Sequence, residues 1–244
     1  MILPNPESRI PNPRLWAVVP AAGVGRRMRA DVPKQYLELG DRTVLEHSLA
    51  ALSAIEGLAG IVVAVASGDP YWPGLRHLPR CPLSVAPGGE QRADSVLNAL
   101  QVLRERAADS DWVLVHDAAR PCVRAEDLQR LVDALRDDPV GGLLAVPVRD
   151  TMKRATDDGR CAATVDRGRL WHALTPQMFR FEALREALVA AQAAGAEITD
   201  DASALERAGQ RPRLIEGHAD NIKITRPEDL ALAEFYLRRQ GRLS

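Results

Sequence analysis

The sequence predicts an α/β fold built on a mainly parallel, twisted sheet with helices on both faces. Short, continuous apolar runs rich in valine and leucine recur along the chain, which is typical of strands buried on both faces. Between these runs lie longer segments with apolar residues at helical spacing. Such alternation of strand and helix indicates parallel strands joined by crossover helices.

Each predicted element depends on its own local pattern. The first strand, residues 15–20, is the continuous run LWAVVP, and the first helix, residues 43–55, places apolar residues three to four positions apart. Further strands are predicted at residues 60–66, 112–116 and 142–148, with weaker ones at 83–86, 213–216 and 221–225. Further helices are predicted at residues 92–107, 125–136, 180–194, 200–208 and 227–238. Ligands of such sheets bind beyond the carboxyl ends of the strands, which is where a site is expected.

One polar stretch, from residue 149 to residue 169, interrupts this alternation. The turn signal Asp157-Asp158-Gly159 lies between segments 151–155 and 162–166, a pattern that predicts a projecting β-hairpin arm over about residues 149–170. An isolated hairpin is only marginally stable in water. We therefore expect the arm to dock on a second copy of the chain, with a mobile loop as the alternative.

Length and composition predict a single domain over residues 15–240, preceded by a flexible tail over residues 1–14. The chain has 244 residues, 46% of them hydrophobic, and a formal net charge of -1, so no global positive field would attract nucleic acid. No apolar run is long enough to span a membrane, and the proline-rich start lacks the apolar region of a signal peptide. Three scattered cysteines without a CxxC pair predict a cytoplasmic protein without disulfides or a zinc site.

The segment directly after the first strand is typical of a nucleotide-binding loop. It reads PAAGVGRRM over residues 20–28 and continues with PKQ over residues 33–35. Small residues and glycines let the backbone turn tightly and direct N–H groups at an anionic ligand, while arginine and lysine pair with phosphate oxygens. A Walker A loop is excluded because Gly-Lys-Ser/Thr is missing. A full dinucleotide fingerprint is excluded because the third glycine of GxGxxG would fall at Met28.

Two further segments follow predicted strands. In HDAARP, residues 116–121, Asp117 leaves the end of a buried strand, where it is placed to hold Mg²⁺ against a triphosphate, and Arg120 beside it can bind phosphate. An N-cap or turn aspartate is the alternative interpretation. In PGGEQRADS, residues 87–95, the glycines permit close approach of a base or ribose and Ser95 offers a hydroxyl, although a capped turn is again the alternative.

Together these segments resemble the 2-C-methyl-D-erythritol 4-phosphate cytidylyltransferase family of the non-mevalonate isoprenoid pathway. The resemblance runs from about residue 16 to about residue 237, with the motifs in family order: AVVPAAGVGRRM, PKQY, GGEQRADSV, VHDAARP, PVRDTMKRA, TVDRGRLWHALTPQ, ITDDASALE and ADNIKITRPEDLALAEF. It implies a Rossmann-like nucleotidyltransferase fold and a homodimer interlocked through the arm. It also implies CTP and a polyol phosphate as substrates and Mg²⁺ as the metal.

The resemblance also implies roles for individual residues. Those expected to line the nucleotide site are Ala21, Ala22, Gly23, Gly89, Glu90, Ser95 and Ala118. Those expected to act on the phosphates are Arg27, Lys34 and Lys223, with Asp117 on the metal. Those expected to bind the methylerythritol phosphate are Arg120, Thr175 and Asp220, joined by Thr151 and Arg167 from the arm of the partner. Glu90 is a small departure from the pattern, in which the resemblance implies aspartate for some relatives.

Three alternatives stay open from the sequence. The same chemistry on another polyol phosphate, such as ribitol 5-phosphate, shares the nucleotide motifs. A nicotinamide-dependent oxidoreductase would need the missing third glycine and an acidic residue for the ribose. A non-catalytic nucleotide-binding protein would tolerate the loss of Asp117 or Lys34, and the presence of both argues against it.

Overall fold

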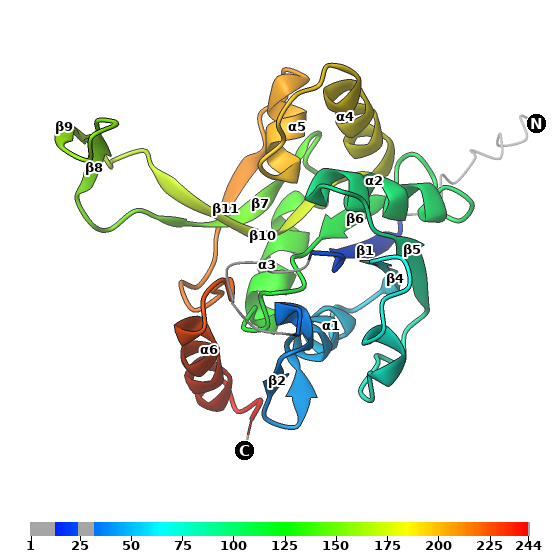
Figure 1. Cartoon of the computed structure of the whole chain (residues 1–244). Helices are drawn as coiled ribbons and strands as arrows, with labels where there is room; N and C mark the ends of the chain where they lie inside the picture. The colour runs from blue at the N-terminus through cyan, green and yellow to red at the C-terminus, as the bar shows by residue number, and fades with distance from the viewer. Residues whose placement is uncertain (1–12, 24–31, 244) are drawn as a thin grey trace, which may run out of the picture.

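The computed structural model describes residues 13–23 and 32–243. A seven-stranded sheet in the order β11-β7-β10-β6-β1-β4-β5 forms its centre, with helices on both faces (Figure 1). Its strands are β1 (Leu15–Pro20), β4 (Leu58–Val65), β5 (Leu83–Pro87), β6 (Trp112–Val115), β7 (Gly141–Pro147), β10 (Trp171–Arg180) and β11 (Arg213–Glu216). The helices are α1 (Val44–Ser53), α2 (Arg92–Leu103), α3 (Ala125–Leu135), α4 (Phe181–Ala193), α5 (Asp201–Arg207) and α6 (Glu228–Arg239). The predicted fold class is confirmed.

The sheet is parallel except at one strand. β1 pairs in parallel with β4 and β6, β4 with β5, and β7 with β11, whereas β10 runs antiparallel between β6 and β7. β10 was not predicted from the sequence: His172 and Ala173 near its start are exposed, and its polar residues Thr175 and Gln177 interrupt the apolar run.

Two other expectations were wrong in detail. The strand predicted at residues 221–225 is absent, because Ile224 is buried in a small cluster with Leu237 of α6 instead of joining the sheet. The helix predicted to reach residue 107 ends at Leu103, where turns take over. Of the predicted tail, residues 1–12 lie outside the described part of the chain.

The core has one hydrophobic cluster on each face of the sheet. Successive strand residues point to opposite faces, so Val19 joins the cluster that contains α1 and α3 while Val18 joins the cluster of α2, α4 and α5. Leu49 of α1 and Leu100 of α2 are both fully buried, one on each side. Helices therefore cover both faces, and the polar residues that follow the strands collect at one edge.

At the opposite end of the strands, where β1 and β6 begin, one buried carboxylate organises the structure. Asp111, just before β6, accepts hydrogen bonds from the Trp16 indole (2.9 Å), the Arg14 amide (2.8 Å) and the Ala108 amide (3.1 Å). Burial by itself would raise the pKa of Asp111, but these hydrogen bonds lower it overall. The charged carboxylate therefore ties the start of β1 to the start of β6.

Replacing Asp111 with asparagine is expected to lower the free energy of unfolding by about 1–3 kcal/mol at pH 7, because buried donors lose acceptors. The folded pKa lies below the unfolded value, so this contribution is present above pH ~4 and is lost as the pH falls through the folded pKa. Urea unfolding of both proteins between pH 3 and pH 7 measures it, with the difference shrinking toward the acid end. A difference that does not change with pH would contradict this role.

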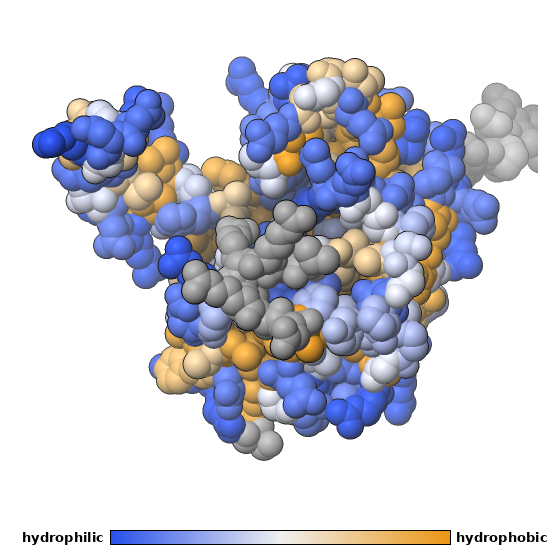
Figure 2. Space-filling model, viewed as in Figure 1, coloured by the Kyte–Doolittle hydropathy of each residue, from blue (hydrophilic) through white to orange (hydrophobic). Residues whose placement is uncertain are grey.

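The arm predicted over about residues 149–170 is present as a separate two-stranded hairpin. β8 (Met152–Ala155) pairs antiparallel with β9 (Cys161–Val165), and these two strands form a sheet of their own. The arm projects from the ends of β7 and β10 (Figure 1), and Figure 2 shows its hydrophilic tip standing apart from the body. Within residues 13–23 and 32–243, every helix is too short or too polar to cross a membrane. Two further short strands, β2 (Glu38–Leu39) and β3 (Arg42–Thr43), precede α1.

Candidate active site

A cavity of about 400 Å³ opens at the carboxyl ends of β1, β5 and β6. This is the edge where a parallel sheet is expected to bind its ligand. The cavity brings together residues that the sequence predicted from separate segments: Ala21, Ala22, Gly23, Lys34, Gly89, Glu90, Ser95, Asp117, Ala118 and Lys223. Arg27, predicted to act beside Lys34, lies outside the described residues.

A second cavity, of about 260 Å³, adjoins the first. Arg120 and Thr175, both predicted to serve the second substrate, line it. The two cavities share Arg92, Asp117 and Lys223, so these charged groups stand at the boundary between two binding spaces.

Glycine in the loop after β5 is required by close packing. A Cβ atom on Gly88 would lie 2.1 Å from the Ala22 Cβ, and one on Gly89 would lie 2.2 Å from the Asp94 Cβ. A larger residue at position 88 would therefore push apart the loops after β1 and β5, and one at position 89 would push this loop away from the first turn of α2. The loop after β1 is also held by Gln35, whose buried side-chain amide donates to the Ala21 carbonyl at 2.6 Å.

Ser95 holds the shape of this wall of the larger cavity. Its hydroxyl accepts a hydrogen bond from the Gly89 amide at 3.0 Å and donates to the Gln91 carbonyl at 3.3 Å. Both of its hydrogen-bonding functions thus serve the turn at residues 89–91, and direct recognition of the nucleotide by Ser95 stays a prediction.

Cations surround the Asp117 carboxylate. Arg92 Nε donates to Asp117 Oδ1 at 2.8 Å, Lys223 Nζ lies 2.7 Å from Oδ2, and Arg120 Nε lies 3.7 Å from the same oxygen. Burial by itself would raise the pKa of Asp117, but the charges of Arg92, Lys223 and Arg120 hold it far below its usual value. The carboxylate is therefore ionised at neutral pH.

A chain of hydrogen bonds from His116 sets the position of the Asp117 backbone. His116 Nε2 lies 3.0 Å from the Arg120 carbonyl oxygen, which can only accept, so Nε2 carries the proton. Burial lowers the pKa of His116 to about 4, so the ring is neutral and Nδ1 accepts from the Thr175 hydroxyl at 3.0 Å. Thr175 Oγ1 in turn accepts from the Asp117 amide at 3.1 Å. The single hydroxyl proton of Thr175 is thereby engaged, which leaves its predicted contact with substrate as a prediction.

Replacing Thr175 with valine is expected to lower the free energy of unfolding by about 1–3 kcal/mol, because it leaves buried polar groups of Asp117 and His116 unpaired. Thr175→Ser keeps the hydroxyl and should retain most of the stability. Urea unfolding of both variants measures the effect, and ¹⁵N chemical shifts of labelled histidine identify the protonated ring nitrogen. A protonated Nδ1 would contradict the proposed direction of the hydrogen bond.

Lys34 reaches the cavity from the short helical turn at Lys34–Tyr36. Its ammonium donates to the Ile224 carbonyl at 2.9 Å, beside Lys223. Lys34 and Lys223 come from opposite ends of the sequence, and the fold places both at one wall of the larger cavity.

Three predicted residues are not brought to these cavities. Thr151 and Arg167 lie exposed at the base of the arm, where Arg167 contacts the Arg149 carbonyl. Asp220 lines neither cavity, because its Oδ2 accepts from Arg124 Nη2 at 2.6 Å. Their roles in substrate binding stay predictions.

Two residues of the site were missed by the sequence analysis. Gln35 and Arg92 stand inside the predicted nucleotide-binding segments, but their sequence context predicted no role for either. An arginine at the first position of a helix that follows a glycine turn was an available signal for Arg92. Its partner Asp201, 109 residues further along the chain, was not available from the sequence pattern.

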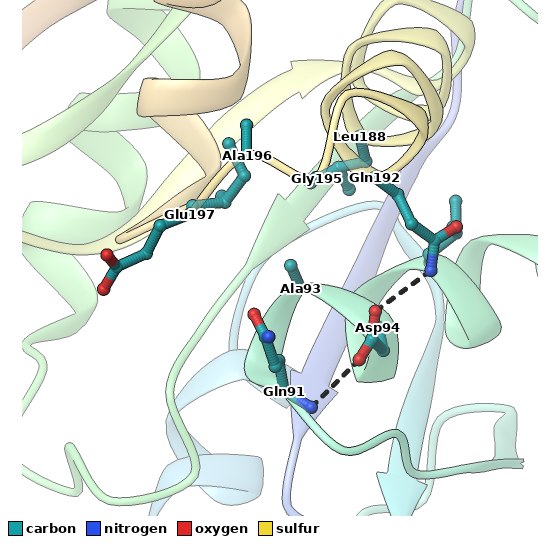
Figure 3. Close-up of a pocket in the computed structure, with 10 residues that line it drawn as sticks. Gln91, Ala93, Asp94, Leu188, Gln192, Gly195, Ala196 and Glu197 are labelled. Atoms are coloured by element: carbon teal, nitrogen blue, oxygen red, sulfur yellow. Dashed lines mark hydrogen bonds between the residues drawn. The ribbon is translucent and has the colours of Figure 1, made fainter.

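A third cavity, of about 470 Å³, lies between α2 and α4 (Figure 3). Its described lining includes Asp94, Gln192 and Glu197 but no lysine or arginine, so it does not suit a triphosphate. One hydrogen bond in its wall joins the two helices, because the Gln192 side chain of α4 donates to Asp94 of α2 at 3.1 Å (Figure 3).

The family model, the relative and the two solved structures described below all point to one family. A family model described as 2-C-methyl-D-erythritol 4-phosphate cytidylyltransferase matches residues 15–239. A protein of that name from Pseudomonas putida (strain GB-1) is 60% identical over 219 residues, which cover 89% of this chain and 93% of that protein. A solved 4-diphosphocytidyl-2C-methyl-D-erythritol synthase is 40% identical with a TM-score of 0.78, covering 92% of this chain and 98% of that one. The Francisella tularensis 2-C-methyl-D-erythritol 4-phosphate cytidylyltransferase is 36% identical with a TM-score of 0.80, covering 92% and 100%.

Proposed function

Because the chain belongs to the 2-C-methyl-D-erythritol 4-phosphate cytidylyltransferase family, we propose that it transfers CMP from CTP to 2-C-methyl-D-erythritol 4-phosphate. The products are 4-diphosphocytidyl-2-C-methyl-D-erythritol and pyrophosphate, and the reaction serves isoprenoid precursor biosynthesis. The observation that carries the proposal is the pair of adjoining cavities that share Asp117 and Lys223. A nucleotide in the larger cavity and a polyol phosphate in the smaller one would meet at these charged groups.

The reaction is an in-line attack by an oxygen of the polyol phosphate on the α-phosphorus of CTP. A new bond forms from that oxygen to the α-phosphorus, and the bond from the α-phosphorus to the bridging oxygen breaks, so pyrophosphate leaves. The second pKa of a phosphate monoester is about 6, so the nucleophile is already ionised near pH 7 and needs no general base. The difficulty is the approach of two anions, which Lys34 and Lys223, together with the predicted Arg27, offset by position and charge.

Mg²⁺ is proposed as the metal of this reaction. Among the described residues no cluster of three or more histidine, cysteine, aspartate or glutamate side chains could form a complete cage. A single carboxylate suits Mg²⁺, which is commonly held by one or two carboxylates and by the phosphates of the substrate. Asp117 fits this role, since its two oxygens have about four lone pairs and its three ion pairs leave one to offer. The metal would neutralise charge that develops on the phosphates.

We also propose a homodimer in which the arm of one subunit completes the site of the other. The exposed hairpin pairs only with itself in the described chain, and two strands alone are marginally stable in water. Thr151 and Arg167, at the base of the arm, would then bind the polyol phosphate in the partner's site. A monomer in light scattering at micromolar concentration would contradict this assembly. A cytoplasmic location is proposed as well, because the three cysteines are free.

The decisive experiment measures pyrophosphate release with Mg²⁺. Methylerythritol phosphate is compared with ribitol phosphate, and CTP with ATP, GTP and UTP. Rapid release only with CTP and methylerythritol phosphate is the expected result. Release with ribitol phosphate instead would keep the chemistry and change the substrate. No release from folded protein that still binds CTP would overturn the proposal.

A further inference from the structure

The Arg92 guanidinium joins two buried carboxylates that come from different elements. Its Nε donates to Asp117 Oδ1 and its Nη2 donates to Asp201 Oδ2, both at 2.8 Å. Asp117 follows β6, and Asp201 is the first residue of α5. Only 8% of the Asp117 side chain and 0% of the Asp201 side chain are exposed. One cation therefore links the loop after β6 to α5 across the boundary of the two cavities.

The turn that carries Arg92 is itself held in place. The Gln91 amide donates to Asp94 Oδ2 at 3.0 Å, and the Gln192 side chain of α4 donates to Asp94 Oδ1 at 3.1 Å. Figure 3 shows both contacts at the first turn of α2. Arg92 thus starts from a turn that is anchored to a neighbouring helix, which limits the positions that its guanidinium can take.

Asp201 shares the charge of Arg92 with Asp117. Its other oxygen, Oδ1, is buried and has no hydrogen-bond partner among the described residues. An arginine divided between two carboxylates is fixed in position by both of them, and Lys223 and Arg120 lie beside Asp117 as well. This arrangement suits a carboxylate that has to keep one position.

We propose that Arg92 is a positioning residue: it fixes the Asp117 carboxylate at the boundary of the two cavities, and Asp201 holds Arg92 in turn. The inference rests on the proposed function, in which Asp117 serves the metal and the phosphates. Two of the three guanidinium nitrogens already donate to carboxylates. In this proposal Arg92 therefore acts on the reaction by positioning Asp117, and not by contacting the substrate.

The test separates folding from positioning. Arg92→Met alone leaves Asp201 buried without a cation, and it is expected to unfold at a lower temperature. The double variant Arg92→Met with Asp201→Asn removes both charges and should recover the thermal stability. Its kcat is nevertheless expected to be about 10–100-fold below that of the wild type, as for other groups that orient a metal ligand. Wild-type kcat in the folded double variant would overturn the inference.

Calorimetry of CTP binding distinguishes positioning from direct contact. If Arg92 acts through Asp117, the double variant binds CTP without Mg²⁺ as the wild type does and loses the gain in affinity that Mg²⁺ gives. A weaker affinity for metal-free CTP would mean that Arg92 contacts the triphosphate directly, and would overturn the inference.

Two further variants complete the design. In an Asp117→Asn background, the double substitution is expected to lower kcat little further, and a full additional 10-fold loss would contradict action through Asp117. Wild-type turnover by Asp117→Asn itself would instead refute the role of Asp117 in the proposed function. Arg130→Met is the matched control, because Arg130 pairs at 2.8 Å with the equally buried Asp127 outside both cavities and should leave kcat unchanged.

Discussion

Replacing Lys34 with alanine is expected to lower kcat about 10²–10³-fold while the protein stays folded, since this is the usual effect of removing one group that stabilises charge in a transition state. Lys34 lines the larger of the two adjoining cavities, and its ammonium donates to the Ile224 carbonyl next to Lys223. A neutral, shorter side chain would leave the negative charge on the phosphates without this cation. Steady-state pyrophosphate release measures the loss, and circular dichroism verifies the fold.

The matched control for this variant is Arg213→Ala. It removes a cation from the edge strand β11, where the side chain is 55% exposed and lies outside both cavities. The control should retain wild-type kcat, which excludes a general effect of net charge. Wild-type turnover by folded Lys34→Ala would mean that the lysine is a structural tether of the loop that contains Ile224.

The fold was predictable from the sequence because its buried parallel strands have no polar face. β1 and β11 have the predicted bounds, and β4 and β7 differ from prediction by one or two residues at each end. The antiparallel strand β10 was not predictable in this way, since Thr175 and Gln177 are buried by hydrogen bonds and not by hydrophobicity. A hydrophobic pattern in the sequence detects buried apolar side chains, but it does not detect buried polar side chains whose hydrogen bonds are made within the fold.

The site was predictable where its residues follow strands in short motifs. Asp117, Lys34 and the glycine loops were identified in this way, and the structure brings them to one cavity. The ion pair of Arg92 with Asp201 was not predictable, because it depends on how α4 packs against both α2 and α5. A lone charge in a sequence gives no sign of its partner, so the electrostatic support of a site becomes visible only once the fold is known.

A dimer built from two different inactive variants is expected to regain about half of the wild-type activity, because one of its two sites is intact if each site combines one body with the partner's arm. The two variants are Lys34→Ala, which alters the body, and Arg167→Ala, which alters the arm. Each is expected to be slow alone, and differently tagged copies can be coexpressed and purified as the mixed dimer.

The control for this experiment pairs Lys34→Ala with Lys223→Ala. Both residues line the same cavity in one body, so neither site of that mixed dimer is intact and no activity should return. Recovery in the first pair but not in the second would identify the arm as the partner's contribution. If the first pair stays as slow as the control pair, Arg167 acts within its own chain. The exposed hairpin would then have to fold back onto the cavities of its own chain. In that case a designed disulfide that holds the arm against its own body would leave the enzyme active.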